Sequence, residues 1–125
     1  MTIAIVLPFN WSEADRQRLL GALALAADKF VESDPTSTMT EYLARSIRIL
    51  YGWLKVCLLT KGVRPAFEFE ERYAEEYLKT IHAALSMIQF EHENRGTVRP
   101  SLEYELEMLE RLHYIAREAV FLAQK

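Results

Sequence analysis

The residues of this chain that could do chemistry are few, and the best metal-binding pattern among them joins Glu110 and His113. They lie three residues apart in "ERLH", the spacing with which carboxylate-bridged di-iron bundles hold their metals. Such a site needs a second Glu-x-x-His pair, but the related segment "QFEH" has Gln89 in place of the acid before His92. We therefore expect no metal and no cofactor, and we expect His113 to be hydrogen-bonded and partly buried.

Other catalytic chemistries also lack their residues. Some small helical ribonucleases place an Arg a few residues before a His, but here Arg72 and His82 are ten positions apart and Arg111 and His113 only two. Cys57 lies in an apolar segment with no base nearby, so we expect a buried, unreactive thiol. The chain has no Gly-rich phosphate loop, no Cys-x-x-Cys and no nucleophile elbow. The sequence therefore predicts a protein without a catalytic site.

Composition restricts the location and the partners. The chain has 125 residues, which suits one domain. Its formal net charge of −3 disfavours nucleic-acid binding, because phosphate contacts need clustered Lys and Arg. A single cysteine allows no intramolecular disulfide, so we expect a reducing, cytoplasmic location. The apolar N-terminal run and the stretch "ILYGWLKVCLL" are both too short to span a bilayer, so we expect no membrane contact.

Apolar residues recur at helical spacing in four segments, each bounded by turn signals. Ser12 with Asp15 opens the first segment almost as a capping box, and Gly62 stands where a C-cap glycine would end the second. Short connections favour antiparallel neighbours. The sequence thus predicts an all-α fold, an antiparallel up-down four-helix bundle with an extended N-terminal arm. We expect one domain over residues 1–125, with the arm over 1–11 and helices over about 12–33, 40–61, 65–94 and 100–123.

The arm itself allows two interpretations. Ile3, Ile5 and Leu7 alternate with smaller residues, which a short strand would also produce. We expect instead that the arm lies across the bundle and buries Phe9 and Trp11.

One octet recurs with five of its eight residues identical, as "VRPAFEFE" at 63–70 and "VRPSLEYE" at 98–105. Proline is favoured at the first helical position, and glutamates in the opening turns complement the helix dipole. We therefore interpret both octets as helix starts at Pro65 and Pro100. We prefer this to two copies of a functional motif, or to two units of a helical solenoid.

The predicted helix over 40–61 carries more apolar surface than one bundle can cover. Its middle is apolar on nearly every side, which is typical of a central helix or of one in an interface. Either the N-terminal arm covers the excess or a second subunit does, which would make the protein a homodimer. Our candidates for that interface are Ile49, Trp53 and Val56.

The second half of the chain is acidic. Residues 63–125 hold twelve acids and eight bases, whereas residues 1–62 hold six and seven. The outward glutamates of the last two predicted helices, with nearby tyrosines, form our candidate partner-binding set: Glu68, Glu71, Tyr73, Glu75, Glu76, Glu103, Tyr104 and Glu107. Several of the glutamates have a basic residue four positions on, so a merely solvated face would explain them too.

These observations favour a non-catalytic binding protein that docks another protein, which would be basic if the acidic face is the site. Immunity proteins, antitoxin-like inhibitors, chaperones and adaptors are of this kind. The alternative is a homo-oligomeric bundle with a ligand site or a metal-dependent enzymatic site in its core or at its subunit interface.

Overall fold

A computed structural model describes residues 1–125 except 9, 60–65, 98–99 and 125. The chain is mostly helical, as predicted, but it adds a small two-stranded sheet that the all-α prediction lacked. In chain order the elements are β1 (Thr2–Val6), α1 (Glu13–Ser33), α2 (Thr38–Leu59), β2 (Ala66–Glu70), the 3-10 turn η1 (Glu71–Tyr73), α3 (Ala74–Glu93) and α4 (Glu103–Ala123).

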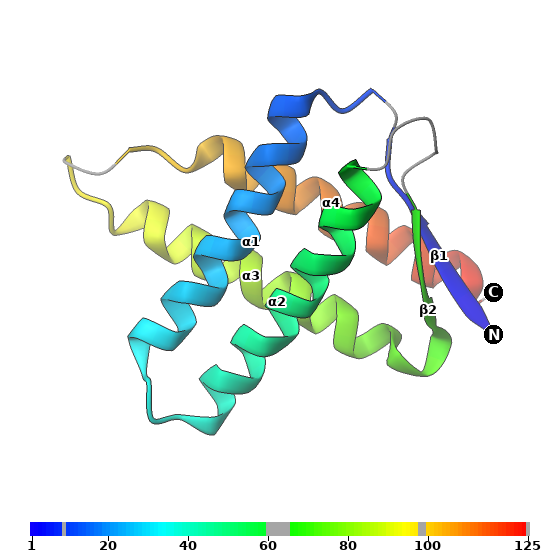
Figure 1. Ribbon diagram of the computed structural model, residues 1–125, viewed down its shortest axis with the longest axis horizontal. Coiled ribbons are helices and arrows are strands. Elements are labelled where there is room, and N and C mark those ends of the chain that lie inside the picture. Colours follow the sequence, from blue (N-terminus) through cyan, green and yellow to red (C-terminus); the bar gives the residue numbers. More distant parts are fainter. Residues whose placement is uncertain (9, 60–65, 98–99, 125) are drawn as a thin grey trace.

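The helices are arranged as two antiparallel pairs. α1 packs along α2 and α3 packs along α4, and the first pair lies across the second (Figure 1). α1 and α3 each contact all three other helices, but α1 packs against them more extensively. Its buried alanines, Ala22, Ala26 and Ala27, let the neighbouring helices approach closely. This crossed arrangement does not by itself establish the predicted up-down four-helix bundle.

β1 and β2 form an antiparallel sheet in which Ile3 pairs with Phe69 and Ile5 with Phe67. These four side chains are buried, and the residues between them are exposed. A burial period of two is that of a strand, and aromatic and β-branched residues favour it. The helix expected over 65–94 is therefore wrong at its start: β2 and η1 replace its first turns, and α3 begins nine residues later than expected.

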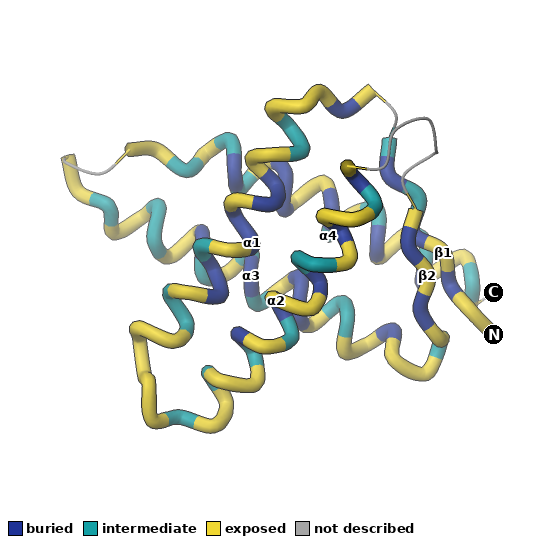
Figure 2. The backbone as a smooth tube through the Cα atoms, in the orientation of Figure 1, coloured by how far each residue is buried: buried dark blue, intermediate teal, exposed yellow. Residues whose placement is uncertain are grey.

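The start of α1 agrees with the sequence. The Ser12 N–H donates to the Asp15 carboxylate and the Asp15 N–H donates to the Ser12 hydroxyl, both at 3.0 Å, which completes the capping box. Trp11 is buried, as expected, within the core that Figure 2 shows in dark blue. The predictions for Phe9 and Gly62 fall outside the described residues.

The two octets fold differently. In the first, Ala66–Glu70 is the strand β2, whereas in the second Leu102 is the N-cap of α4 and the helix begins at Glu103. The difference lies in the partners, because Phe67 and Phe69 meet a complementary strand, whereas the described residues 100–105 pair with none. The interpretation of both octets as helix starts is therefore wrong for the first and three residues early for the second.

We expect the sheet to depend on Phe69, whose side chain is 5% exposed. Phe69→Ala should lower the free energy of unfolding by about 3–5 kcal/mol, through lost burial and the remaining cavity. Phe90→Ala is the matched control, because Phe90 on α3 is 57% exposed and its removal should change stability by about 0.5 kcal/mol or less. Urea denaturation followed by circular dichroism measures both. Equal effects would contradict the packing of β2.

Candidate functional site

α2 has two apolar faces. One packs into the core, and the other carries Met39, Tyr42, Ile49, Trp53 and Val56, which are 40–69% exposed. The described part of the N-terminal arm does not cover this second face, because β1 is held by β2 and by α4. The predicted interface residues are thus on the surface, and whether a second subunit covers them stays a prediction.

A cavity of about 210 Å³ opens between this exposed face of α2 and the start of α3. Both helices and η1 contribute to its lining, which consists of Tyr42, Ser46, Ile49, Tyr73, Glu76, Tyr77 and Thr80. We call it the tyrosine cavity. It brings together Ile49, from the predicted oligomer interface, and Tyr73 and Glu76, from the predicted partner-binding set.

Tyr77 holds the wall of the tyrosine cavity in place. Its ring centroid lies 4.6 Å from that of Phe69 on β2 and 5.6 Å from that of Trp53 on α2. Burial, and then the charge of Glu76 and the neighbouring Tyr73, raise the pKa of Tyr77. The hydroxyl therefore sits in a negative local field and stays protonated at neutral pH.

The lining of the cavity is mainly aromatic, with few polar groups. It offers aromatic rings, two hydroxyl-bearing aliphatic side chains and one carboxylate, and among its lining residues there is neither a histidine nor a cysteine. Sequence reasoning missed Tyr42, Ser46 and Thr80. Tyr42 and Ser46 share a stripe of alternating three- and four-residue steps with Ile49 and Trp53, a pattern that could have identified them.

The predicted partner-binding residues fall into two groups. Glu68, Glu71, Tyr73, Glu75 and Glu76 lie on β2, η1 and the first turn of α3. The remaining three, on α4, lie at the other end of the antiparallel helix pair (Figure 1). At 1.5 Å per residue along α3, roughly 25 Å separates the two groups.

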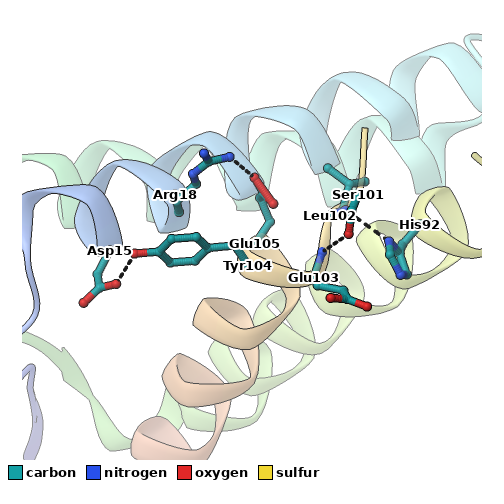
Figure 3. A network of polar contacts seen from close by, with 8 residues as sticks. All are labelled: Asp15, Arg18, His92, Ser101, Leu102, Glu103, Tyr104 and Glu105. Atoms are coloured by element: carbon teal, nitrogen blue, oxygen red, sulfur yellow. Dashed lines mark hydrogen bonds and ion pairs between the residues drawn. The ribbon is translucent and has the colours of Figure 1, made fainter. Parts of the chain in front are cut away.

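Tyr104 belongs to an internal network rather than to an open surface (Figure 3). Its hydroxyl donates to the Asp15 carboxylate, and this hydrogen bond is the main cause that lowers the pKa of Asp15 and raises the pKa of Tyr104. The guanidinium of Arg18 lies 5.2 Å from the Tyr104 ring centroid and bonds the Glu105 carboxylate at 2.7 Å. Glu107, by contrast, is exposed and pairs with Arg111 at 2.6 Å. The Tyr104 network joins the start of α4 to the start of α1.

The histidines occupy two structural positions. His82 on α3 and His113 on α4 lie with their ring centroids 5.7 Å apart. His92 accepts the Leu102 N–H at its Nδ1 atom over 3.1 Å, which ties the end of α3 to the entry of α4 (Figure 3). Within the described ranges, no group of three or more His, Cys, Asp or Glu side chains could hold a metal ion.

Cys57 also has a structural contact. Its thiol donates to the carbonyl of Ala66 at 3.0 Å, linking α2 to β2. Burial is the main cause that raises the pKa of the thiol, which keeps it protonated and a poor nucleophile.

The Arg18–Glu105 pair offers a test of the network. The Glu105 side chain is 10% exposed and that of Arg18 54%, and the second Glu105 oxygen accepts no hydrogen bond from the described residues. Arg18→Met should destabilise the fold by about 1–2 kcal/mol, less than for a fully buried pair because Arg18 is half-exposed. Adding Glu105→Leu should restore part of that loss, because no unpaired carboxylate then remains buried. A double variant no more stable than the single one in urea would contradict this account.

The partial burial of His113, which also lies beside His82, should make stability depend on pH. Burial, and then the charges of Arg117 and His82, lower the pKa of His113. The unfolded chain therefore takes up this proton at a higher pH than the folded protein does. Stability should fall as the pH decreases through about 6.5 toward the lowered value, and then level off. Urea midpoints at neutral and mildly acidic pH should differ less for His113→Asn than for the unaltered protein. An NMR titration that places His113 at or above the ordinary value would contradict the prediction.

We compared the chain with protein families, curated proteins and solved structures. No family model, no curated protein and no solved structure matches it. Among the described residues, no helix combines the length and apolar character needed to cross a membrane.

Proposed function

We propose that this chain is a non-catalytic helical-bundle domain that docks a partner protein. The docking site is the α2–α3 surface, which we define as Tyr42, Ile49 and Trp53 of α2 with Tyr73 and Glu76 beside the start of α3. Immunity proteins, antitoxin-like inhibitors, chaperones and adaptors work by docking of this kind.

The observation that carries the proposal is the exposed apolar stripe of α2 beside the tyrosine cavity. Ile49 and Trp53 are 48% and 40% exposed, and Tyr73 is 40% exposed on the opposite side of the groove. Exposed apolar patches rimmed by polar residues commonly mark interaction sites. Tyr and Trp are also the residues that most often dominate binding energy, especially next to a pocket that a partner side chain can fill.

The acids around this surface suggest the charge of the partner. Glu71, Glu75 and Glu76 fall within six residues of one another at the start of α3. Carboxylates at the rim of an apolar patch increase the association rate of a basic partner and disfavour an acidic one. The Glu103 and Glu107 end of the molecule is too distant to join the same small interface.

A second candidate function is self-association through α2, as in a homodimer. Met39, Tyr42, Ser46, Ile49, Trp53 and Val56 follow alternating steps of three and four residues, which is the spacing of a coiled-coil seam. With about 200 Å² for a fully exposed large side chain, the five large ones leave roughly 550 Å² accessible, about two thirds of the ~800 Å² per partner of a standard interface. A ligand or metal-dependent site at such an interface belongs to this second candidate.

Site-specific photo-crosslinking in the native host tests both candidates. A benzoylphenylalanine in place of Ile49 should give one discrete adduct on irradiation, because the side chain lies in the groove. The same residue in place of Glu118, an exposed position on α4 outside the cavity lining, is the matched control and should not give that adduct. An adduct of twice the 14.5 kDa chain mass, with a dimer of the purified protein in sedimentation, would select self-association.

Charge reversal distinguishes the contribution of the acidic residues to partner binding from that of the exposed apolar residues of α2. The triple change of Glu71, Glu75 and Glu76 to Lys should reduce formation of a heterologous adduct at least several-fold. Identical adducts from positions 49 and 118, or none from either, would refute docking through the α2–α3 surface.

A further inference from the structure

The tyrosine cavity has the size of a receptor for one side chain. Its volume of about 210 Å³ is below the roughly 300–1,000 Å³ of ordinary small-molecule sites. It has room for roughly seven water molecules, or for one long side chain. An anchor residue of a docked protein therefore suits it better than a cofactor or a metabolite.

The lining combines aromatic rings with one carboxylate. Tyr42 of α2, Tyr73 of η1 and Tyr77 of α3 meet at the cavity, with Glu76 beside them. The negative face of an aromatic ring attracts a cation, and a carboxylate adds a direct charge. Glu76 is exposed, and an uncharged apolar anchor would bring no opposite charge to its carboxylate.

The charges around the cavity favour a cation on balance. Glu71, Glu75 and Glu76 are negative, whereas Lys79 and the positive end of the α3 dipole, roughly half a charge, oppose them. Nearby basic residues already have acidic partners: Arg72 bonds Glu70 at 2.6 Å, and Arg45 bonds Glu41 at 3.1 Å. Among the described residues, a net negative charge therefore remains at the mouth of the cavity.

Stacking of a guanidinium on a tyrosine ring already occurs within this chain. The Arg72 guanidinium lies 4.7 Å from the centroid of the Tyr73 ring, and Arg18 lies similarly over Tyr104. Tyr42 is 53% exposed, so much of its surface is open to an incoming group. Guanidinium groups stack on aromatic rings and bond carboxylates through a planar fork, which ammonium groups cannot do.

On these grounds, and resting on the proposed docking function, we infer that the tyrosine cavity receives an arginine side chain of the partner protein. The guanidinium stacks on Tyr42 and bonds the Glu76 carboxylate, because Arg72 already lies over the Tyr73 ring. The apolar stripe of α2 then packs against the surface that presents this arginine.

NMR titration of the full chain with N-acetyl-arginine methylamide tests the inference without knowledge of the partner. Amide resonances of the cavity residues and the Trp53 indole should shift and saturate, with a dissociation constant on the order of 10 mM for so small a probe. N-acetyl-citrulline methylamide is the matched neutral probe and should give at most a tenth of the shift at equal ionic strength. The corresponding lysine amide should bind more weakly than the arginine amide.

Two glutamine variants test which carboxylate binds the arginine amide. Glu76→Gln should weaken arginine-amide binding about tenfold, whereas Glu75→Gln removes the same charge one residue away, outside the cavity lining, and should weaken it less than threefold. Tyr42→Leu keeps an apolar wall but removes a ring, and it should also weaken binding. Circular dichroism of each variant confirms that the fold is retained.

The outcomes separate this inference from the docking proposal. If the arginine amide shifts no cavity resonance, if citrulline amide binds as well, or if lysine amide binds more tightly, the inference is overturned. If the photo-adduct from position 49 persists in that case, docking through the α2–α3 surface still stands. If the adduct is also missing, both are refuted.

Discussion

The pairing of β1 with β2 is the constraint on which the rest of the structure depends. It joins the first residues of the chain to Ala66–Glu70, and the Glu71 N–H continues it by donating to the Met1 carbonyl at 2.9 Å. Closing so long a loop costs only modestly more entropy than closing a short one. Burial of Phe67 and Phe69 against the N-terminal strand offsets that cost. The pairing then fixes where η1 turns and where α3 begins, so that Tyr77 stands against the Phe69 ring.

The same pairing explains why α2 keeps an apolar face toward solvent. An N-terminal arm lying across the bundle could have covered Ile49 and Trp53. Instead the arm is used as β1, where its apolar residues complete the core beside α4. The exposed stripe of α2 is therefore a consequence of the sheet. Because Trp53 also contacts Tyr77, the stripe and the tyrosine cavity form one continuous surface.

Local signals in the sequence predict local structure well, and the errors arise where a distant partner decides. Ser12 and Asp15 suffice to place the start of α1, since a capping box needs only residues three apart. The segment "AFEFE" has a period of two, but its preceding proline and its glutamates also suit a helix start. Only β1, some 60 residues away, decides between them. The tyrosine cavity was unpredictable for the same reason, because Tyr42 and Tyr77 meet through tertiary packing alone, although Ile49, Tyr73 and Glu76 were each identified separately.

The two octets show how similar residues acquire different roles. Both place aromatic and acidic side chains at a junction before a helix, but the antiparallel packing of α3 and α4 puts the junctions at opposite ends (Figure 1). At the second junction Tyr104 bonds Asp15 and Glu105 bonds Arg18. These polar groups therefore hold α4 against α1. At the first junction the buried side chains of Phe67 and Phe69 hold β2 against β1 instead. Tyr73 and Glu76, just beyond, are then left at the rim of a cavity. Whether such a junction stabilises the fold or remains open to a ligand thus depends on which of its side chains pack against other elements. The positions of the acidic residues alone do not decide between the two.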